Sequence, residues 1–188
     1  MEKTLMFASL DTHFSMYQGH LDLIDKIRER DMNVIVDVVL EHIGKEVIVK
    51  DGEPFDTGGV CPRGIFVTEN KELISITRQA VENNNLERTL LLPTYTILGV
   101  PTDAGDFNRA GFNIISLISP PIYIYDEIDT PEMVAVEQLN PVATAFTEIV
   151  ENVDRTPTKV VKKKSWIPKY RFQYYWAAVK YIAGMMKD

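Results

Sequence analysis

Cysteine and histidine are scarce in this chain of 188 residues, which contains one cysteine, Cys61, and three histidines. A single cysteine cannot form a disulfide within the chain, and it excludes a cysteine-rich zinc cluster. The N-terminal stretch MEKTLMFASLD has an acidic residue at position 2 and no long apolar core, so it lacks the features of a secretory signal. Because little cysteine is typical of a reducing compartment, we expect a cytoplasmic protein.

The net charge of −7 is unevenly distributed along the chain. Residues 159–188 contain eight basic residues and one acidic residue, which gives this segment +7 and leaves −14 on the other 158 residues. An acidic body argues against a surface that grips nucleic acid, so we expect no nucleic-acid partner. The basic end of the chain is left as a contact for an anionic surface.

Alternating apolar segments indicate the fold class. We predict strands at 5–10, 33–40, 47–49, 65–67, 90–92 and 112–118, and helices at 17–30, 71–83 and 136–150, with a loop at 56–62. Asn70 is the expected N-cap of the second helix, and Asp51-Gly52 is a turn. The length fits one body, residues 1–154, built as a three-layer αβα sandwich with a mixed sheet.

The stretch 101–134 organises the rest of the chain. Its apolar middle, residues 112–118, is a predicted buried strand between two acidic loops, one with Asp103 and Asp106 and the other with Asp126, Glu127 and Asp129. Ligands of open α/β sheets bind at the carboxyl ends of strands. We therefore look for a site in the loop 119–129.

The same stretch carries a resemblance to a known family. Thr102-Asp103, Phe107, the segment 110–113 and Asp129-Thr130 are similar to motifs of the co-catalytic zinc aminopeptidases. Residues 5–154 correspond to the C-terminal two thirds of that family's catalytic domain, which implies a fold that is incomplete at its N-terminus. The resemblance implies a metallopeptidase-like hydrolase with a peptide or peptide-like substrate.

The resemblance also shows where this chain departs from the family's zinc chemistry, in which two zinc ions activate a bridging water. His13 and Phe14 occupy the positions of two adjacent glutamates, a general base and a zinc ligand. Glu41 stands for a metal-binding aspartate, and Tyr125 for the last metal histidine. Two further ligands lie upstream of anything in this sequence. The resemblance thus implies a hydrolase domain without a complete two-zinc site, and the alternative is a non-catalytic pseudo-peptidase that serves as an interaction module.

A reduced site for a single zinc ion is one interpretation of His13, Glu41 and His42, with His13 as both metal ligand and catalytic residue. The other interpretation makes His13 a loop histidine, Glu41 a hydrogen-bonded acid at a strand end and His42 a partly exposed neighbour. Asp103 either supports a metal ligand or belongs to a turn. His20, on the first helix, is expected at the surface.

Two interpretations stay open for the loop 119–129. Tyr123 and Tyr125 either line a pocket for an apolar or aromatic group or pack against the body. Asp129 is expected to cap the helix that begins at Thr130-Pro131.

The last segment, 155–188, differs in composition from the body. It is basic and aromatic, and helical spacing places one apolar face on it, formed by Phe172, Tyr175, Trp176, Val179, Ile182, Ala183 and Met186. Docking onto the body, onto a protein partner or onto a second copy is one interpretation. Contact with an anionic membrane surface is the other, since the segment is too short and too charged to span a bilayer.

Overall fold

The computed structural model describes residues 2–10, 17–96 and 99–162. Its main sheet has the strand order β1-β6-β4-β5, in which β1 is Asp37–Leu40, β6 is Ile114–Ile118, β4 is Arg63–Val67 and β5 is Thr89–Pro93. The pairs β1/β6 and β4/β5 are parallel, and β4 runs antiparallel to β6. The carboxyl ends of β1 and β6 therefore lie at the edge where β4 and β5 begin.

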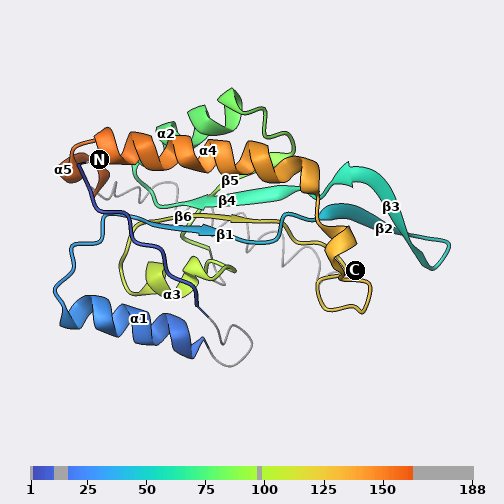
Figure 1. The fold of residues 1–188 in the computed structure, drawn as a ribbon, viewed down its shortest axis with the longest axis horizontal. Coiled ribbons are helices and arrows are strands. Elements are labelled where there is room, and N and C mark those ends of the chain that lie inside the picture. The colour runs from blue at the N-terminus through green and yellow to red at the C-terminus, as the bar shows by residue number, and fades with distance from the viewer. Residues whose placement is uncertain (1, 11–16, 97–98, 163–188) are drawn as a thin grey trace, which may run out of the picture.

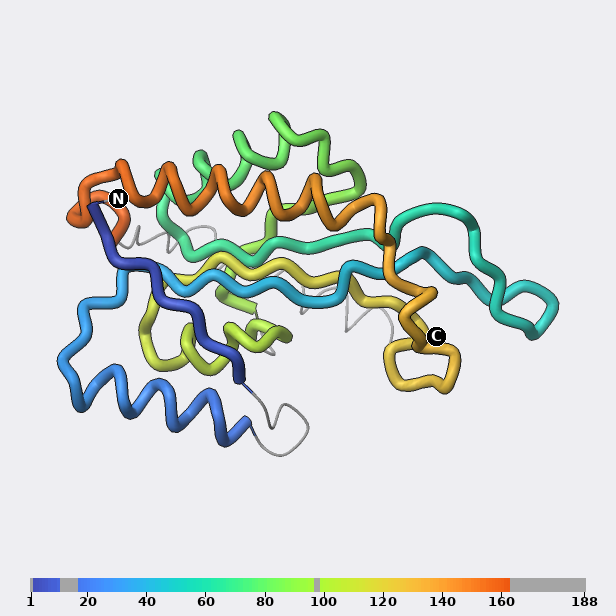
Figure 2. The backbone as a smooth tube through the Cα atoms, in the orientation of Figure 1, coloured from blue at the N-terminus to red at the C-terminus, as the bar shows by residue number. Residues whose placement is uncertain are grey.

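Helices cover both faces of this sheet (Figure 1). Helices α2 (Lys71–Asn83) and α4 (Val136–Arg155) lie on one face, and α1 (Gln18–Glu29) and α3 (Ala104–Arg109) lie on the other. The chain is thus a mixed α/β protein, and its layers are compatible with the predicted αβα sandwich. A hairpin of β2 (Lys45–Lys50) and β3 (Glu53–Val60) extends beyond the end of the sheet (Figure 2).

Alternation along the strands produces two apolar clusters, one on each face of the sheet. Ile115 and Leu117 of β6 point to the α2/α4 side, where they join a cluster of buried residues that includes Leu73 and Ile149. Ile114 points to the other side, into the cluster with α1 and α3. Successive side chains of a strand face opposite sides of a sheet, so one buried strand supplies both cores. Fully burying an Ile or Leu side chain contributes roughly 1.5–3 kcal/mol.

The amide of Asn70 connects the start of α2 to the end of the described chain. Its oxygen accepts hydrogen bonds from the backbone N–H groups of Glu72 (2.9 Å) and Leu73 (3.0 Å), which confirms the predicted N-cap. Its nitrogen donates to the carbonyls of Val160 (2.8 Å) and Val161 (2.9 Å) in α5 (Thr158–Val161). Because Val161 is fully buried in the core, the packed body continues to this point, past the predicted boundary at 154. Residues 163–188, most of the predicted tail, lie outside the described residues.

Several predicted elements are confirmed close to their expected bounds, among them α1, α2, β6 and the turn at Asp51-Gly52, whose φ angles are both positive. Helix α4 runs five residues beyond the predicted end at 150. Among the described residues, none of the helices has the length and apolarity needed to cross a bilayer.

Three predictions of local structure are wrong. Residues 5–10 form no strand, and the chain is held before them by Lys3, whose backbone N–H donates to the Asp154 carboxylate (2.7 Å). The predicted loop at 56–62 is largely β3, because pairing with β2 outweighs the low strand propensity of Gly58-Gly59. The acidic segment around Asp103 and Asp106 is helical as α3, because Phe107 anchors it in the core.

Candidate functional site

The carboxyl ends of β1 and β6 are held together by a short network. The backbone N–H of Glu41, just after β1, donates to the Leu117 carbonyl at 2.9 Å and prolongs the β1/β6 ladder. The Ser119 hydroxyl, just after β6, donates to the carbonyl of His42. His42 is exposed and has φ +47°. These bonds fix the direction in which the chain leaves the sheet, and so they place the Glu41 side chain.

Glu41 and Asp103 meet at this edge, although 62 positions separate them. The backbone N–H of Asp103 donates to Glu41 Oε1 at 2.7 Å. Asp103 stands at the N-terminal end of α3, and the preceding Thr102 is held by a 2.8 Å hydrogen bond from the Ser116 hydroxyl of β6. The buried strand therefore positions both the helix and the carboxylate that contacts it. Two of the residues predicted for the site are brought together.

His20 belongs to the same region, and the prediction that it is a surface residue is wrong. Its side chain is 2% exposed and lies between the rings of Tyr17 and Phe107, at centroid distances of 5.3 and 6.1 Å. Its Nε2 lies 3.9 Å from Asp103 Oδ2, and its Nδ1 lies 3.7 Å from Asp106 Oδ2. Both distances exceed a hydrogen bond. Nδ1 is buried without a hydrogen-bond partner among the described residues.

A sequence signal for His20 existed. The residue precedes the buried Ile24 and Ile27 by four and seven positions, which places it on the apolar stripe of α1. The polarity of the imidazole alone had suggested a surface position.

Tyr123 and Tyr125 have opposite environments. Tyr123 is 2% exposed, and its hydroxyl lies 3.0 Å from the Lys45 carbonyl and 3.1 Å from the Met133 carbonyl, so it packs between the start of β2 and the loop before α4. Burial, as the main cause, raises the pKa of this phenol. Tyr125 is 81% exposed.

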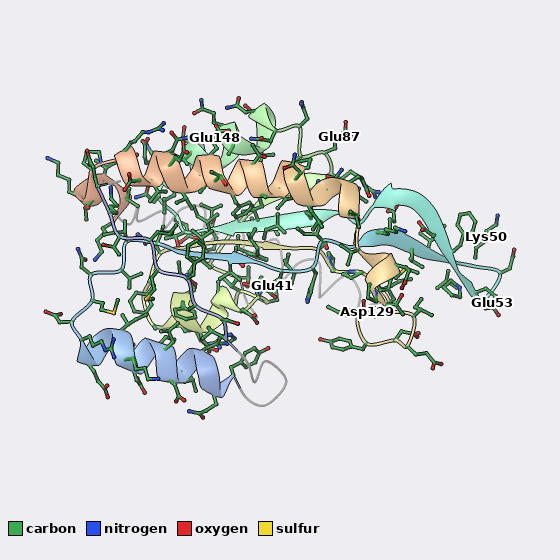
Figure 3. The ribbon with its side chains drawn as sticks, in the orientation of Figure 1. Glu41, Lys50, Glu53, Glu87, Asp129 and Glu148 are labelled. Atoms are coloured by element: carbon green, nitrogen blue, oxygen red, sulfur yellow. The ribbon has the colours of Figure 1, made fainter. Side chains whose placement is uncertain are left out.

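Asp129 is not a helix cap. The short 3-10 helix Pro131–Met133 has Thr130 at its N-cap position, and α4 begins only at Val136. The chain extends between these two elements, so the capping signal of Thr130-Pro131 serves a single turn. Figure 3 shows Asp129 in the loop at the same end of the sheet as Glu41.

Within residues 2–10, 17–96 and 99–162, no group of three or more His, Cys, Asp and Glu side chains is arranged to hold a metal ion. Glu41 Oε1 already accepts the Asp103 N–H. His13 lies outside the described residues, so the predicted combination of His13 with Glu41 stays a prediction.

Two side chains, one at each end of the main sheet, have shifted pKa values. Burial raises the pKa of Asp37, in β1, to about 6, and its Oδ2 has no hydrogen-bond partner in the described part of the chain. Burial, and secondarily the Glu46 carboxylate, raises the pKa of the Cys61 thiol. A raised thiol pKa disfavours the reactive thiolate, so Cys61 is a poor nucleophile.

Comparisons of this chain with protein-family models, with curated proteins and with solved structures give no match.

Proposed function

We propose that this chain is a metallopeptidase-like hydrolase domain of the zinc aminopeptidase type that lacks a complete two-zinc site. The observation that carries the proposal is the bond between Glu41 and Asp103. The resemblance singled out these two positions independently, one as a metal-binding acid and the other as part of the Thr-Asp motif. Their meeting at the carboxyl end of parallel strands is the arrangement that a site in an α/β sheet requires.

Within this proposal, Glu41 and His13 are the residues that would hold a single zinc ion. Carboxylate oxygen and imidazole nitrogen are both ordinary zinc ligands. Asp103 and His20 would support Glu41, because Asp103 holds the Glu41 carboxylate through its backbone N–H and His20 lies beside Asp103. The substrate class under this proposal is a peptide or a peptide-like amide.

Zinc titration of chelator-treated full-length protein tests the proposal, together with hydrolysis of an aminoacyl-nitroanilide with and without added zinc. We expect zinc uptake and turnover, and we expect Glu41→Gln to weaken zinc binding at least tenfold, since an amide is a poor zinc ligand. Glu151→Gln is the matched control, because Glu151 lies exposed on α4 in a pair with Arg155. Uptake that is identical in the Glu41→Gln variant would exclude the assigned site.

A non-catalytic interaction module is the second candidate. It is favoured by the exposure of Tyr125 and Ile122, two large side chains in the loop at the site. Under this candidate the protein takes up no zinc and does not turn over substrate, and the segment 163–188 binds a protein partner or a second copy. Truncation should follow Lys162, because Val161 is a core residue. An unchanged elution volume in size-exclusion chromatography after this truncation would remove self-association through the tail.

A further inference from the structure

A polar cavity lies at the edge where β4 and β5 begin, and the site around Glu41 contributes no residue to it. Its volume is about 270 Å³, and its lining residues are Val60, Arg63, Asn85, Glu87, Arg88 and Gln138. Two guanidinium groups and two side-chain amides give it many N–H donors. Such a lining suits an acceptor-rich ligand.

Arg63 is the unusual member of this lining. It is the first residue of β4 and is 3% exposed. Its Nη2 donates to the Glu87 carbonyl at 2.9 Å, whereas Nε and Nη1 are buried and have no hydrogen-bond partner among the described residues. No carboxylate among the described residues forms an ion pair with Arg63. A buried cation without a counter-charge is strongly unfavourable, so the arrangement calls for an anion.

Arg88 does not need this anion. Its Nη2 lies 2.5 Å from Glu46 Oε1, and its Nη1 donates to the Val60 carbonyl at 2.9 Å. Glu46 thus balances Arg88. Glu87 contacts Arg63 through its backbone carbonyl, and Figure 3 shows its side chain pointing away from the body. The cavity is therefore left with one uncompensated positive charge, that of Arg63.

We propose that this cavity binds a small carboxylate ligand whose negative charge neutralises Arg63. A guanidinium group matches the planar geometry of a carboxylate. One uncompensated positive charge favours a monoanion over a phosphate dianion, which would bring an excess negative charge next to Glu46. The amides of Asn85 and Gln138 would supply further donors to the ligand. Burial lowers the pKa of Arg63, which is consistent with a guanidinium group that needs a negative partner. The proposal is independent of any zinc site.

Titration of the full-length protein with sodium acetate, followed by amide NMR at constant ionic strength against sodium chloride, tests the proposal. We expect saturating shifts confined to the residues around the cavity, 60–63, 85–88 and Gln138. Arg63→Met keeps an unbranched apolar stem but removes the guanidinium group and its charge, and we expect it to weaken acetate binding at least tenfold, the effect of losing a charge-assisted hydrogen bond. Arg155→Met is the control and keeps the wild-type affinity, since Arg155 lies exposed at the far end of α4 from Gln138.

Each other outcome overturns a defined part of the proposal. Saturation by inorganic phosphate at lower concentration than by acetate would show that the ligand class is wrong. If acetate and phosphate shift the amide signals of the wild-type protein no more than chloride does, the cavity binds neither acetate nor phosphate. This result refutes the proposal even where Arg63→Met does not fold. Acetate binding of wild-type strength in a folded Arg63→Met protein would remove Arg63 from the site.

Discussion

Asp37 offers a direct test of how burial acts on a charge in this sheet, through the substitution Asp37→Asn. Burial raises the pKa of its carboxyl from 3.8 to about 6 in the folded protein. The folded state therefore binds this proton more tightly than the unfolded state does, so stability falls as the pH rises from 3.8 to 6 and stays reduced above it. At 1.36 kcal/mol per pKa unit, the shift corresponds to about 3 kcal/mol.

An asparagine at this position cannot ionise, so the variant escapes this penalty. We expect its stability advantage over the wild type to increase from about 1.5 kcal/mol at pH 5 to about 3 kcal/mol at pH 7, and these are upper values because Asp37 is only partly buried. Urea denaturation at pH 5, 6 and 7 measures the difference. Asp25→Asn is the control, since the Asp25 side chain is 69% exposed. A difference that does not change between pH 5 and 7 would refute the reasoning, whatever its size.

Two further substitutions test the contacts that hold the body together. Asn70→Ala removes the cap of α2 and both hydrogen bonds to α5, so we expect the free energy of unfolding in urea to fall by about 2–4 kcal/mol. Asn70→Ser keeps only the cap, so its free energy of unfolding should fall by less. Equal losses in the two variants would argue against the α5 contact. Gly44→Ala places a Cβ 2.6 Å from the Tyr123 hydroxyl, so we expect a loss of about 1–3 kcal/mol that becomes smaller in a Tyr123→Phe background. Additive losses in the double variant would contradict that clash.

The parts of the fold that could be predicted from the sequence are those with a local signal. Helix α2 has its predicted bounds because the Asn70 cap and the apolar spacing after it lie within the same short segment. β6 has an apolar run long enough to be buried on both faces. The strand β3 escaped prediction because its exposed residues and Gly58-Gly59 have little strand propensity, and only the partner strand β2 decides its conformation.

Glu41 and Asp103 were both singled out by the sequence, but the hydrogen bond between them could not be predicted. The end of β1 was expected to present Glu41, and the Thr-Asp motif pointed to Asp103. However, the bond uses the backbone N–H of Asp103, and that donor became available only because α3 begins there. The Arg63 cavity was not foreseen at all. Arg63 and Arg88 come together through the β4/β5 register, which pairs Arg63 with Thr89, and no local pattern shows this register.

The reversal of direction between β6 and β4 explains why two chemically different regions lie at one edge of the sheet. The carboxyl ends of β1 and β6 deliver Glu41, while the amino ends of β4 and β5 deliver Arg63 and Arg88. In an all-parallel sheet these arginines would lie at the opposite edge from Glu41. The antiparallel step therefore adds cationic groups to an edge whose other strands supply acidic ones.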